Sequence, residues 1–526
     1  MNNQSVVKRR REEDDDGSAI SIDILNQLPK HILHHIISLL PQRDAIRTCV
    51  LSKSWRYLWH DRLNVEFREV DHLFDRKNKF WPFLDKTLQR YLDQNLSLQK
   101  FHFDIYHCQA DFVLLQKWIP LVIMNMGVRS LSLTFTYFRE NTEAVYRLPL
   151  VVFQSESLVE LHLQRCNLNT LKSTDNVMLN NLQTLRLHFV DISDEIFEKI
   201  ISGCPLIENL ELLYCIGLKS IKFHKHRNLK YIDCLVDNQP IIEIENAHPL
   251  ESVHIQNFSR DLFLPLKKMH FTHLKSLDLY RVQLPADIFD NFSSCFPCLN
   301  DLTLIRCDGL KEFRLLSSSI KRLIVKMRIN AFIDTPNILY FEYSDDAFLP
   351  SIKFATTSND WKSEISLRQL YFDKDATSWF LRLNKLLKAL SQSHITLKMI
   401  CSDKENRQIK DSDGGLYKPV VVDHLTFLEC LPTDPAIVNC FLRICRPWYI
   451  HMDRYCDWRA KCNLVKYISK LPDETGCYFW LQDLEEVSIE VWDIEAKDWN
   501  SVQRTSLQAL YNSQHQIRLR LTWKDQ

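Results

Sequence analysis

The sequence predicts an α/β fold in which a small helical unit precedes a long array of short parallel strands and helices. Helical patterns with clear boundaries occupy residues 28–59. An apolar-x-x-apolar-x-apolar template then recurs along the chain. Only 8 glycines occur in 526 residues, and neither GxGxxG nor GxxxxGK[ST] is present. The phosphate-binding loops of nucleotide-dependent α/β enzymes are therefore not expected.

Composition argues against several classes of function. Lys plus Arg and Asp plus Glu both number 66, so no basic excess favours a nucleic acid or an acidic membrane surface. The longest apolar run, Trp118 to Met126, is far below the ~20 residues of a membrane-spanning helix. The start of the chain is charged and unlike a signal peptide. We therefore expect the 16 cysteines to be reduced and mostly buried, in the cytosol or the nucleus.

Residues 1–21 form a charged tail that we expect to be disordered, because it offers almost no apolar surface to bury. It contains a basic tetrad followed by five acidic residues. The tetrad is either a nuclear import signal or part of a solvated tail whose charges cancel locally. Its residues are Lys8, Arg9, Arg10 and Arg11.

Residues 22–66 predict three short helices. Pro29 suits the start of the first, and Pro41 ends it after Leu40. A brief second helix covers Asp44 to Val50, and Ser52 caps the third. A unit of about 40 residues is near the size below which a chain rarely folds alone. Its apolar residues exceed what so small a core can hide, which suggests a covering partner surface.

This segment resembles an F-box, with Leu28-Pro29, Leu40-Pro41, Asp44-Ala45 and an ending at Trp55–Trp59 typical of plant members. The resemblance spans the whole motif and implies docking on a Skp-type adaptor, and through it on a cullin ubiquitin ligase. Some of the apolar side chains must instead pack the three helices together. The predicted adaptor-binding residues are Leu28, Pro29, Ile32, Leu33, Ile36, Leu40, Val50, Leu51, Trp55 and Trp59.

Residues 67–95 predict a helical linker, with Phe83, Leu84, Leu88 and Leu92 at helical spacing between Val70 and Gln94. The repeats then occupy residues 96–345. Successive second anchors lie between 18 residues (Leu323 to Phe341) and 30 residues (Phe101 to Leu131) apart, and most intervals fall in the leucine-rich range. The eleven anchor sets begin at Leu98, Val128, Leu158, Leu182, Ile207, Leu229, Leu250, Leu274, Leu299, Ile320 and Ile338.

In this template the anchors of each short strand point into a stacked core, and the x between them points to a concave face. Cys166, Cys215 and Cys307 occupy a position where the repeat accepts a buried Asn or Cys. Convex helices are expected in the longer units, after Ser193 and after Pro285. These features resemble the cysteine-containing leucine-rich repeats that follow F-boxes in plant proteins. We therefore expect one cooperative solenoid.

The concave face is predicted to be mixed in charge, slightly acidic in its middle and basic near Arg322 and Lys326. It favours a partner segment of some basic character, although an ordinary solvated surface, with binding at loops or at the C-terminal end, remains an alternative. A small-hormone pocket is disfavoured, since it would need a basic floor and the basic residues of this face are scattered. The candidate substrate-facing residues are His162, Arg186, Glu211, Asp233, His254, Asp278, Thr303 and Arg322.

Residues 346–526 show a weaker period. Strands are expected around Ile395, Leu425, Ile450, Val487 and Leu519, with helices at Trp379–Leu390, Pro435–Cys445 and Lys461–Lys470. We interpret this region as irregular repeats that continue the stack, with a separate α/β domain as the alternative.

No metal site and no cofactor are predicted. Cys295 and Cys298 have zinc-ligand spacing but lack a second pair at a matching distance, and both fit the entry to a repeat strand. A looser cluster, explained better as buried thiols, comprises Cys440, Cys445, Cys456, Cys462 and His451.

The sequence thus predicts a non-catalytic substrate receptor of a Skp-cullin-F-box ubiquitin ligase, which binds an unknown protein through its repeats. No nucleophile, base and orienting group stand in a recognisable motif. The alternatives are an interaction scaffold outside any ligase, a small-molecule-sensing receptor, and an enzyme formed by residues 345–526.

Overall fold

The computed structural model divides into two compact units, Met1–Lys219 and Ser220–Gln526, called here unit 1 and unit 2. The basic tetrad at Lys8–Arg11 and the predicted cap at Ser52 lie outside the described residues. The structure describes residues 28–51, 55–68, 80–105, 112–135, 146–223, 226–237, 241–244, 249–258, 262–263, 271–285, 292–310, 312–345, 348–355, 360–367, 376–400, 418–432, 435–469, 479–493, 495–503 and 516–524.

Unit 1 begins with the predicted three-helix unit. Pro29 and Pro41 are the N-terminal cap residues of its first two helices, where a missing N–H costs nothing. The side chains of Leu33, Ile37, Ala45, Trp55 and Leu58 form its buried core. Its elements are α2 (Lys30–Leu39), α3 (Gln42–Arg47), η1 (Thr48–Val50), α4 (Trp55–Leu58) and η2 (Trp59–Asp61).

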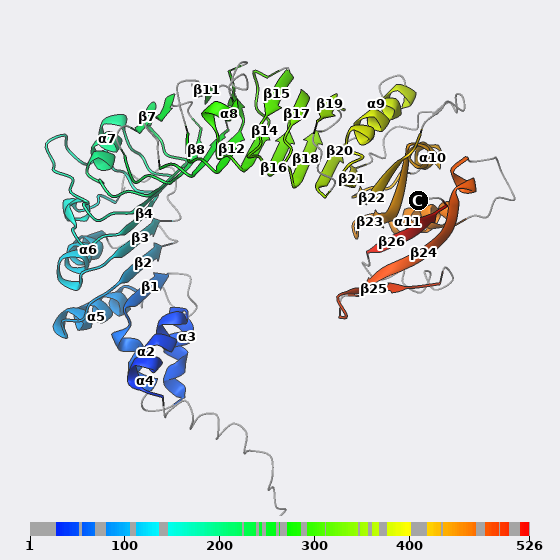
Figure 1. Ribbon diagram of the computed structural model, residues 1–526. Coiled ribbons are helices and arrows are strands. Elements are labelled where there is room, and N and C mark those ends of the chain that lie inside the picture. The colour runs from blue at the N-terminus through cyan, green and yellow to red at the C-terminus, as the bar shows by residue number, and fades with distance from the viewer. Residues whose placement is uncertain are drawn as a thin grey trace, which may run out of the picture. The chain divides into compact units, whose positions relative to one another are not determined.

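The rest of unit 1 is a ladder of six parallel strands that pair in chain order, from β1 to β6. Figure 1 shows α5, α6 and α7 on one face of this ladder. The elements are β1 (Asn64–Arg68), α5 (Phe80–Asp93), β2 (Lys100–Ile105), α6 (Phe112–Met126), β3 (Ser130–Phe135), η4 (Leu150–Gln154), β4 (Glu160–Gln164), β5 (Thr184–His188), α7 (Asp194–Ser202) and β6 (Asn209–Leu213).

Two elements of unit 1 were not predicted. Strand β1 does not match the apolar template, because Arg62 occupies the first anchor position, ahead of the buried second and third anchors Val65 and Phe67. Helix α6 is apolar on most sides and contains Pro120, so it lacks an amphipathic signature. Of the predicted linker helix, α5 accounts for Phe80–Asp93, and residues 69–79 lie outside the described part.

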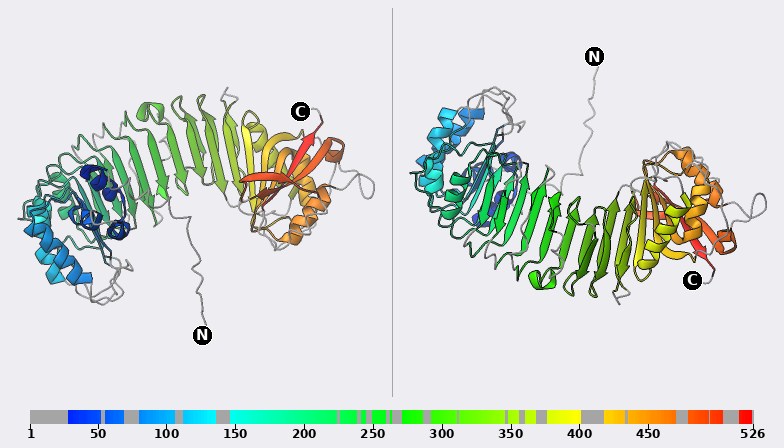
Figure 2. Two further views of the ribbon diagram at one scale, coloured as in Figure 1. Left: turned by 90° about the horizontal axis from the view of Figure 1, so that it is seen from below. Right: turned by 90° about the horizontal axis from the view of Figure 1, so that it is seen from above.

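Unit 2 holds a second parallel ladder, in the order β8-β10-β12-β14-β16-β18-β20-β21-β22-β23. Figure 2 shows these strands side by side. Their bounds are β8 (Tyr231–Val236), β10 (Ser252–Asn257), β12 (Ser276–Tyr280), β14 (Asp301–Ile305), β16 (Arg322–Lys326), β18 (Tyr340–Asp345), β20 (Lys362–Leu367), β21 (His394–Ile400), β22 (Val420–Leu428) and β23 (Cys445–Met452).

The anchors of the template are buried as predicted. All three anchors of all eleven repeats are at most 5% exposed. Two of the repeat cysteines donate to carbonyl groups of the neighbouring strand. Cys215 Sγ donates to the Leu187 carbonyl at 3.3 Å, and Cys307 Sγ to the Leu279 carbonyl at 3.4 Å. Burial raises the pKa of the Cys307 thiol to about 11, so it stays protonated.

The prediction of convex helices is only partly right for unit 2. Where repeats are short, the opposite side of the unit carries small parallel sheets, because a span of about 21 residues leaves too little chain for a helix. The one described helix there, α8 (Phe292–Cys295), has four residues. The strands are β7 (Ser220–Phe223) with β9 (Ile241–Ile244), β11 (Leu262–Phe263) with β13 (Val282–Gln283), and β15 (Glu312–Leu316), β17 (Asn330–Asp334) and β19 (Ile352–Phe354).

The C-terminal region continues the parallel ladder as far as β23 and then departs from it. Strands β24 and β26 pair antiparallel, as do β26 with β23 and β25 with β24, so repeats do not extend to the end of the chain. Strand β20 was missed because the buried Ser363 stands at an anchor position. Cys445, expected on a helix, opens β23. The remaining elements are α9 (Ala376–Ala389), α10 (Pro435–Ile444), α11 (Trp458–Ile468), η6 (Phe479–Gln482), β24 (Leu484–Asp493), β25 (Asp498–Ser501) and β26 (Ile517–Trp523).

Candidate functional site

The three-helix unit sorts its predicted adaptor-binding residues into core and surface. Leu33 and Trp55 lie in the core, at 4% and 3% exposed. Four others pack against that core and are partly buried: Leu28, Ile36, Leu40 and Trp59. The remaining four are exposed: Pro29, Ile32, Val50 and Leu51.

The exposed set is strongly apolar. Val50 is 83% exposed, Leu51 40% and Ile32 37%. Leu39, which was not predicted, is 72% exposed and lies seven residues after Ile32, on the same face of α2. A signal for it was available in that i, i+4, i+7 spacing, with Ile36 between them. Four large apolar side chains on so small a unit form a surface suited to protein contact.

Polar contacts fasten the three-helix unit to the first repeats. Arg62 Nη2 donates to the Leu40 carbonyl at 2.7 Å, and Tyr91 Oη donates to the Arg62 carbonyl at 2.8 Å. Arg90 Nη2 donates to the His60 carbonyl at 3.0 Å, and its guanidinium stacks on the Trp59 ring. Burial lowers the pKa of Arg62. These contacts hold the three-helix unit against β1 and α5.

The open face of each ladder, meaning the x side chains between anchors, carries the candidate substrate-facing residues. In unit 1, His162, Arg186 and Glu211 stand opposite one another on β4, β5 and β6. The structure therefore brings these three residues together as the template predicted.

Their side chains bond mainly to each other. Ser132 Oγ lies 3.2 Å from His162 Nδ1, and His162 Nε2 lies 3.2 Å from His188 Nδ1. His188 Nε2 is 2.7 Å from Glu211 Oε1, and Arg186 Nε donates to Glu211 Oε2 at 3.1 Å. His188 was not among the predicted substrate-facing residues. It pairs in register with Gln164 and Leu213, and neither residue marks it as part of a network.

The histidine at the centre of this network is neutral. Burial, together with the neighbouring His188, Arg186 and His102, lowers the pKa of His162 to about 4. A neutral imidazole has one donor and one acceptor nitrogen, which matches a relay from Ser132 to His188. These side chains contact one another, so the network shapes the open face of unit 1.

On the open face of unit 2, the histidine has carboxylate neighbours instead of cationic ones. Asp233, His254, Asp278 and Thr303 stand in one row across β8, β10, β12 and β14. His254 Nδ1 lies 3.7 Å from Asp278 Oδ2. Asp278 raises the pKa of His254, and Asp233 adds to the effect. Burial works against ionisation of Asp278, but polar contacts with His254 and Thr303 leave its pKa lowered.

Arg322, the last predicted substrate-facing residue, lies in a different row, opposite Asp301 and Tyr340. Its guanidinium lies 5.4 Å from the centre of the Tyr340 ring. It therefore does not join the row of Asp278 and Thr303.

Neither cysteine group assembles a metal site. Among the described residues, no three His, Cys, Asp or Glu side chains are placed to hold a metal ion. Cys298 is exposed and Cys295 half-buried. In the second group, Cys445 and Cys456 are buried and donate to the Phe441 and Phe427 carbonyls. In the part of the chain that the structure describes, no helix is long and apolar enough to span a membrane.

Comparison with known proteins places these features in one family. Residues 25–66 match the F-box domain family, and residues 115–263 match the family of LRR repeats of the FBD-associated F-box protein At5g56370. Two F-box/LRR-repeat proteins of Arabidopsis thaliana, At3g59200 and At5g02910, are 34% and 28% identical over 213 and 271 residues. These matches cover 39% and 51% of this chain, and 39% and 50% of the relatives' lengths.

A third relative is covered more fully. F-box/LRR-repeat protein 25 of Arabidopsis thaliana is 31% identical over 215 residues, which are 40% of this chain and 76% of that protein. The chain belongs to the plant F-box/LRR-repeat family.

Proposed function

We propose that this protein is the substrate-recognition subunit of a Skp-cullin-F-box ubiquitin ligase. The observation that carries the proposal is the exposed apolar surface of the F-box, at Ile32, Leu39, Val50 and Leu51. Burying such surface against an adaptor helix would contribute roughly 25 cal/mol per Å². The repeats would bind the protein to be ubiquitinated.

The rigid junction supports a receptor role. Because Arg62, Arg90 and Tyr91 tie the F-box to the first repeats, a substrate bound by the ladder of unit 1 would be held at a defined position relative to the adaptor. Holding two reactants in this way raises their effective concentration without any chemistry by the receptor itself. We accordingly propose that the protein is not an enzyme.

Capture of a purified Skp-type adaptor by the full chain tests the first step. Val50→Asp places a charge at the surface that we assign to the adaptor, and burying an unpaired charge costs several kcal/mol. We expect capture to fall by more than about 100-fold. Val113→Asp on α6 is the matched control, since Val113 is 81% exposed and Val50 83%. It should capture adaptor as well as the wild type does.

Equal capture by wild type and Val50→Asp, with circular dichroism unchanged, would refute this surface as the adaptor site. Ligase function is separated from a scaffold role by the ligand's fate. With a reconstituted adaptor, cullin and conjugating enzyme, a receptor supports ubiquitin transfer to a repeat-bound protein, whereas a scaffold binds that protein without transfer.

A further inference from the structure

The residue directly after each strand occupies a special position in the repeats. Its φ is positive, at 56° for Arg165, 53° for Phe189 and 54° for Tyr214 in unit 1. In unit 2 the values are 53° for Arg281 and 52° for Arg306. The backbone N–H groups of Arg281 and Arg306 donate to the last carbonyl of the next strand, at 2.8 and 2.9 Å. Equivalent side chains are thereby stacked at about the 4.8 Å strand spacing.

In unit 1 these positions cover one another. The Arg165 guanidinium lies 5.2 Å from the centre of the Phe189 ring, and that ring stacks on Tyr214 at 4.7 Å. The position is therefore a cation and two aromatic rings in one column, in which Phe189 remains 40% exposed.

In unit 2 the same positions hold two neighbouring guanidinium groups. Arg281 donates to the Phe258 carbonyl at 3.1 Å and lies 5.6 Å from the Tyr280 ring centre. Arg306 makes no side-chain hydrogen bond, ion pair or ring contact with the described residues. Like charges on adjacent strands repel, so this pair costs stability unless an anion binds between them.

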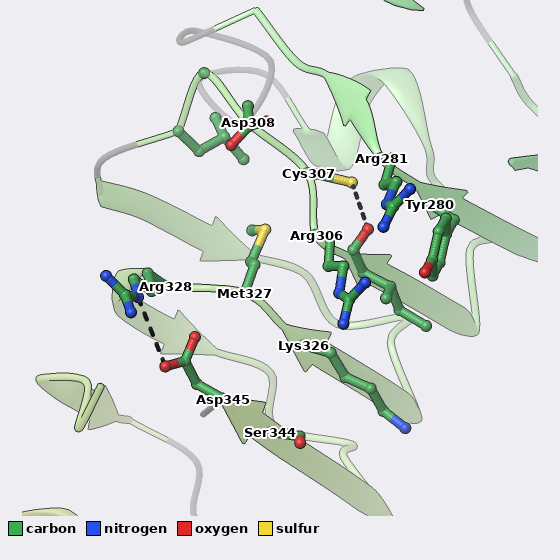
Figure 3. Close-up of a pocket in the computed structure, with 13 residues that line it drawn as sticks. Tyr280, Arg281, Arg306, Cys307, Asp308, Lys326, Met327, Arg328, Ser344 and Asp345 are labelled. Atoms are coloured by element: carbon green, nitrogen blue, oxygen red, sulfur yellow. Dashed lines mark hydrogen bonds and ion pairs between the residues drawn. The ribbon is translucent and has the colours of Figure 1, made fainter. Parts of the chain in front are cut away.

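The two arginines line a pocket of about 670 Å³ at the ends of β12, β14, β16 and β18. Figure 3 shows Arg306 between Arg281 and Lys326. The lining holds four cations and two carboxylates, hence a net charge of 4 − 2 = +2; they are Arg281, Arg306, Lys326, Arg328, Asp308 and Asp345.

Two of the four cations are paired with carboxylates. Arg328 Nε lies 3.7 Å from Asp345 Oδ1, and Lys326 Nζ is 2.7 Å from Glu342 Oε1, a residue outside the lining. Neither carboxylate is in ion-pair contact with Arg281 or Arg306 among the described residues. The uncompensated charge is therefore concentrated on these two guanidinium groups, whose planar forks suit carboxylate or phosphate groups.

We propose that this pocket binds an acidic segment of a protein, with Arg281 and Arg306 holding carboxylate or phosphate side chains. The cations spread over two strand spacings, roughly 10 Å. An extended peptide presents alternate side chains about 6.6 Å apart, so two or three acidic residues would span the pocket. Under the proposed function this segment belongs to the substrate. Acidic recognition replaces the earlier expectation of a basic partner at this part of the repeats.

Fluorescence anisotropy with the full chain tests the proposal, using a labelled decaglutamate peptide and a neutral Gly-Ser peptide of equal length. We expect the wild type to bind decaglutamate and not the neutral peptide. Arg281→Gln combined with Arg306→Gln should weaken binding by at least about tenfold, since hydrogen bonds to charged groups are lost. Lys321→Gln is the matched control: it removes an exposed charge at the opposite end of β16 and should change affinity less than twofold.

Equal affinity in the double variant, or an equal loss in Lys321→Gln, would overturn the proposal. Stabilisation of the wild type by pyrophosphate, lost in the double variant and without peptide binding, would also overturn it in favour of a small-anion site. Adaptor capture is measured on the same samples. The pocket variants should keep it and Val50→Asp should keep peptide binding, so failure of this inference is distinguishable from failure of the proposed function.

Discussion

Two histidines at the same place in the repeat template have opposite surroundings in the two units. His162 in unit 1 lies between two anchors of β4, and His254 in unit 2 lies between two anchors of β10. His162 faces imidazole and guanidinium groups, and its pKa is lowered to about 4. His254 faces Asp278 and Asp233, and its pKa is raised. The repeat thus fixes where a side chain stands, while its neighbours in adjacent strands decide its chemistry.

Both units share the layer of buried anchors, and we expect substitutions there to have the largest effects on stability. Leu163→Ala in unit 1 and Leu277→Ala in unit 2 each remove a side chain at most 2% exposed. Each should lower the free energy of unfolding by about 2–5 kcal/mol, because a cavity is left in a packed core. Leu39→Ala, at a side chain 72% exposed, should change it by less than about 0.5 kcal/mol. Urea denaturation measures all three, and a ladder variant no less stable than Leu39→Ala would contradict the shared core.

The acid side of the stability profile contains the contribution of His162, together with that of His451, whose pKa burial also lowers to about 4. The pKa of His162 is about 4 in the folded chain against 6.5 for an ordinary histidine, so the unfolded chain binds more protons between these values. Stability should therefore fall as pH falls from 6.5 towards 4. His162→Gln should reduce the slope of the free energy of unfolding against pH by no more than about 1 kcal/mol per pH unit, after allowance for solvent screening.

Unfolding curves at pH 4.5, 5.5 and 6.5 give this slope for the wild type and the variant. Parallel slopes would show that His162 is not buried as a neutral group in solution.

The neutral side of the profile isolates His254, with a smaller expected effect because this side chain is more exposed. Its folded pKa lies above 6.5, so its contribution is complete below 6.5 and is lost as pH rises through the raised folded value. His254→Gln should remove that loss, and Asp278→Asn should do the same because Asp278 is its principal partner. NMR titration of the His254 ring measures the pKa directly, and a value at or below 6.5 would end the contrast with His162.

Sequence reasoning succeeded where one side chain carries the signal. Leucines spaced by three and then two residues identify a strand and its buried face without knowledge of the neighbours. Pro29 likewise marks the start of the first helix, and Pro41 its end. It failed where a polar residue replaces an anchor. Arg62 and Ser363 are buried at anchor positions, because each forms a hydrogen bond with a distant segment, at Leu40 and Ser393 respectively. The apolar template therefore did not identify the strands β1 and β20.

The sequence by itself determined the family pattern: an F-box, strands with alternating buried and open side chains, and buried cysteines at repeat positions such as Cys166 and Cys307. The tertiary structure decided which F-box side chains remain exposed, since Ile32 and Leu33 are adjacent in sequence and differ only in the face of α2 they occupy. It also decided which charges meet. Arg281 and Arg306 are 25 positions apart in the sequence and become neighbours only because β12 and β14 pair in register.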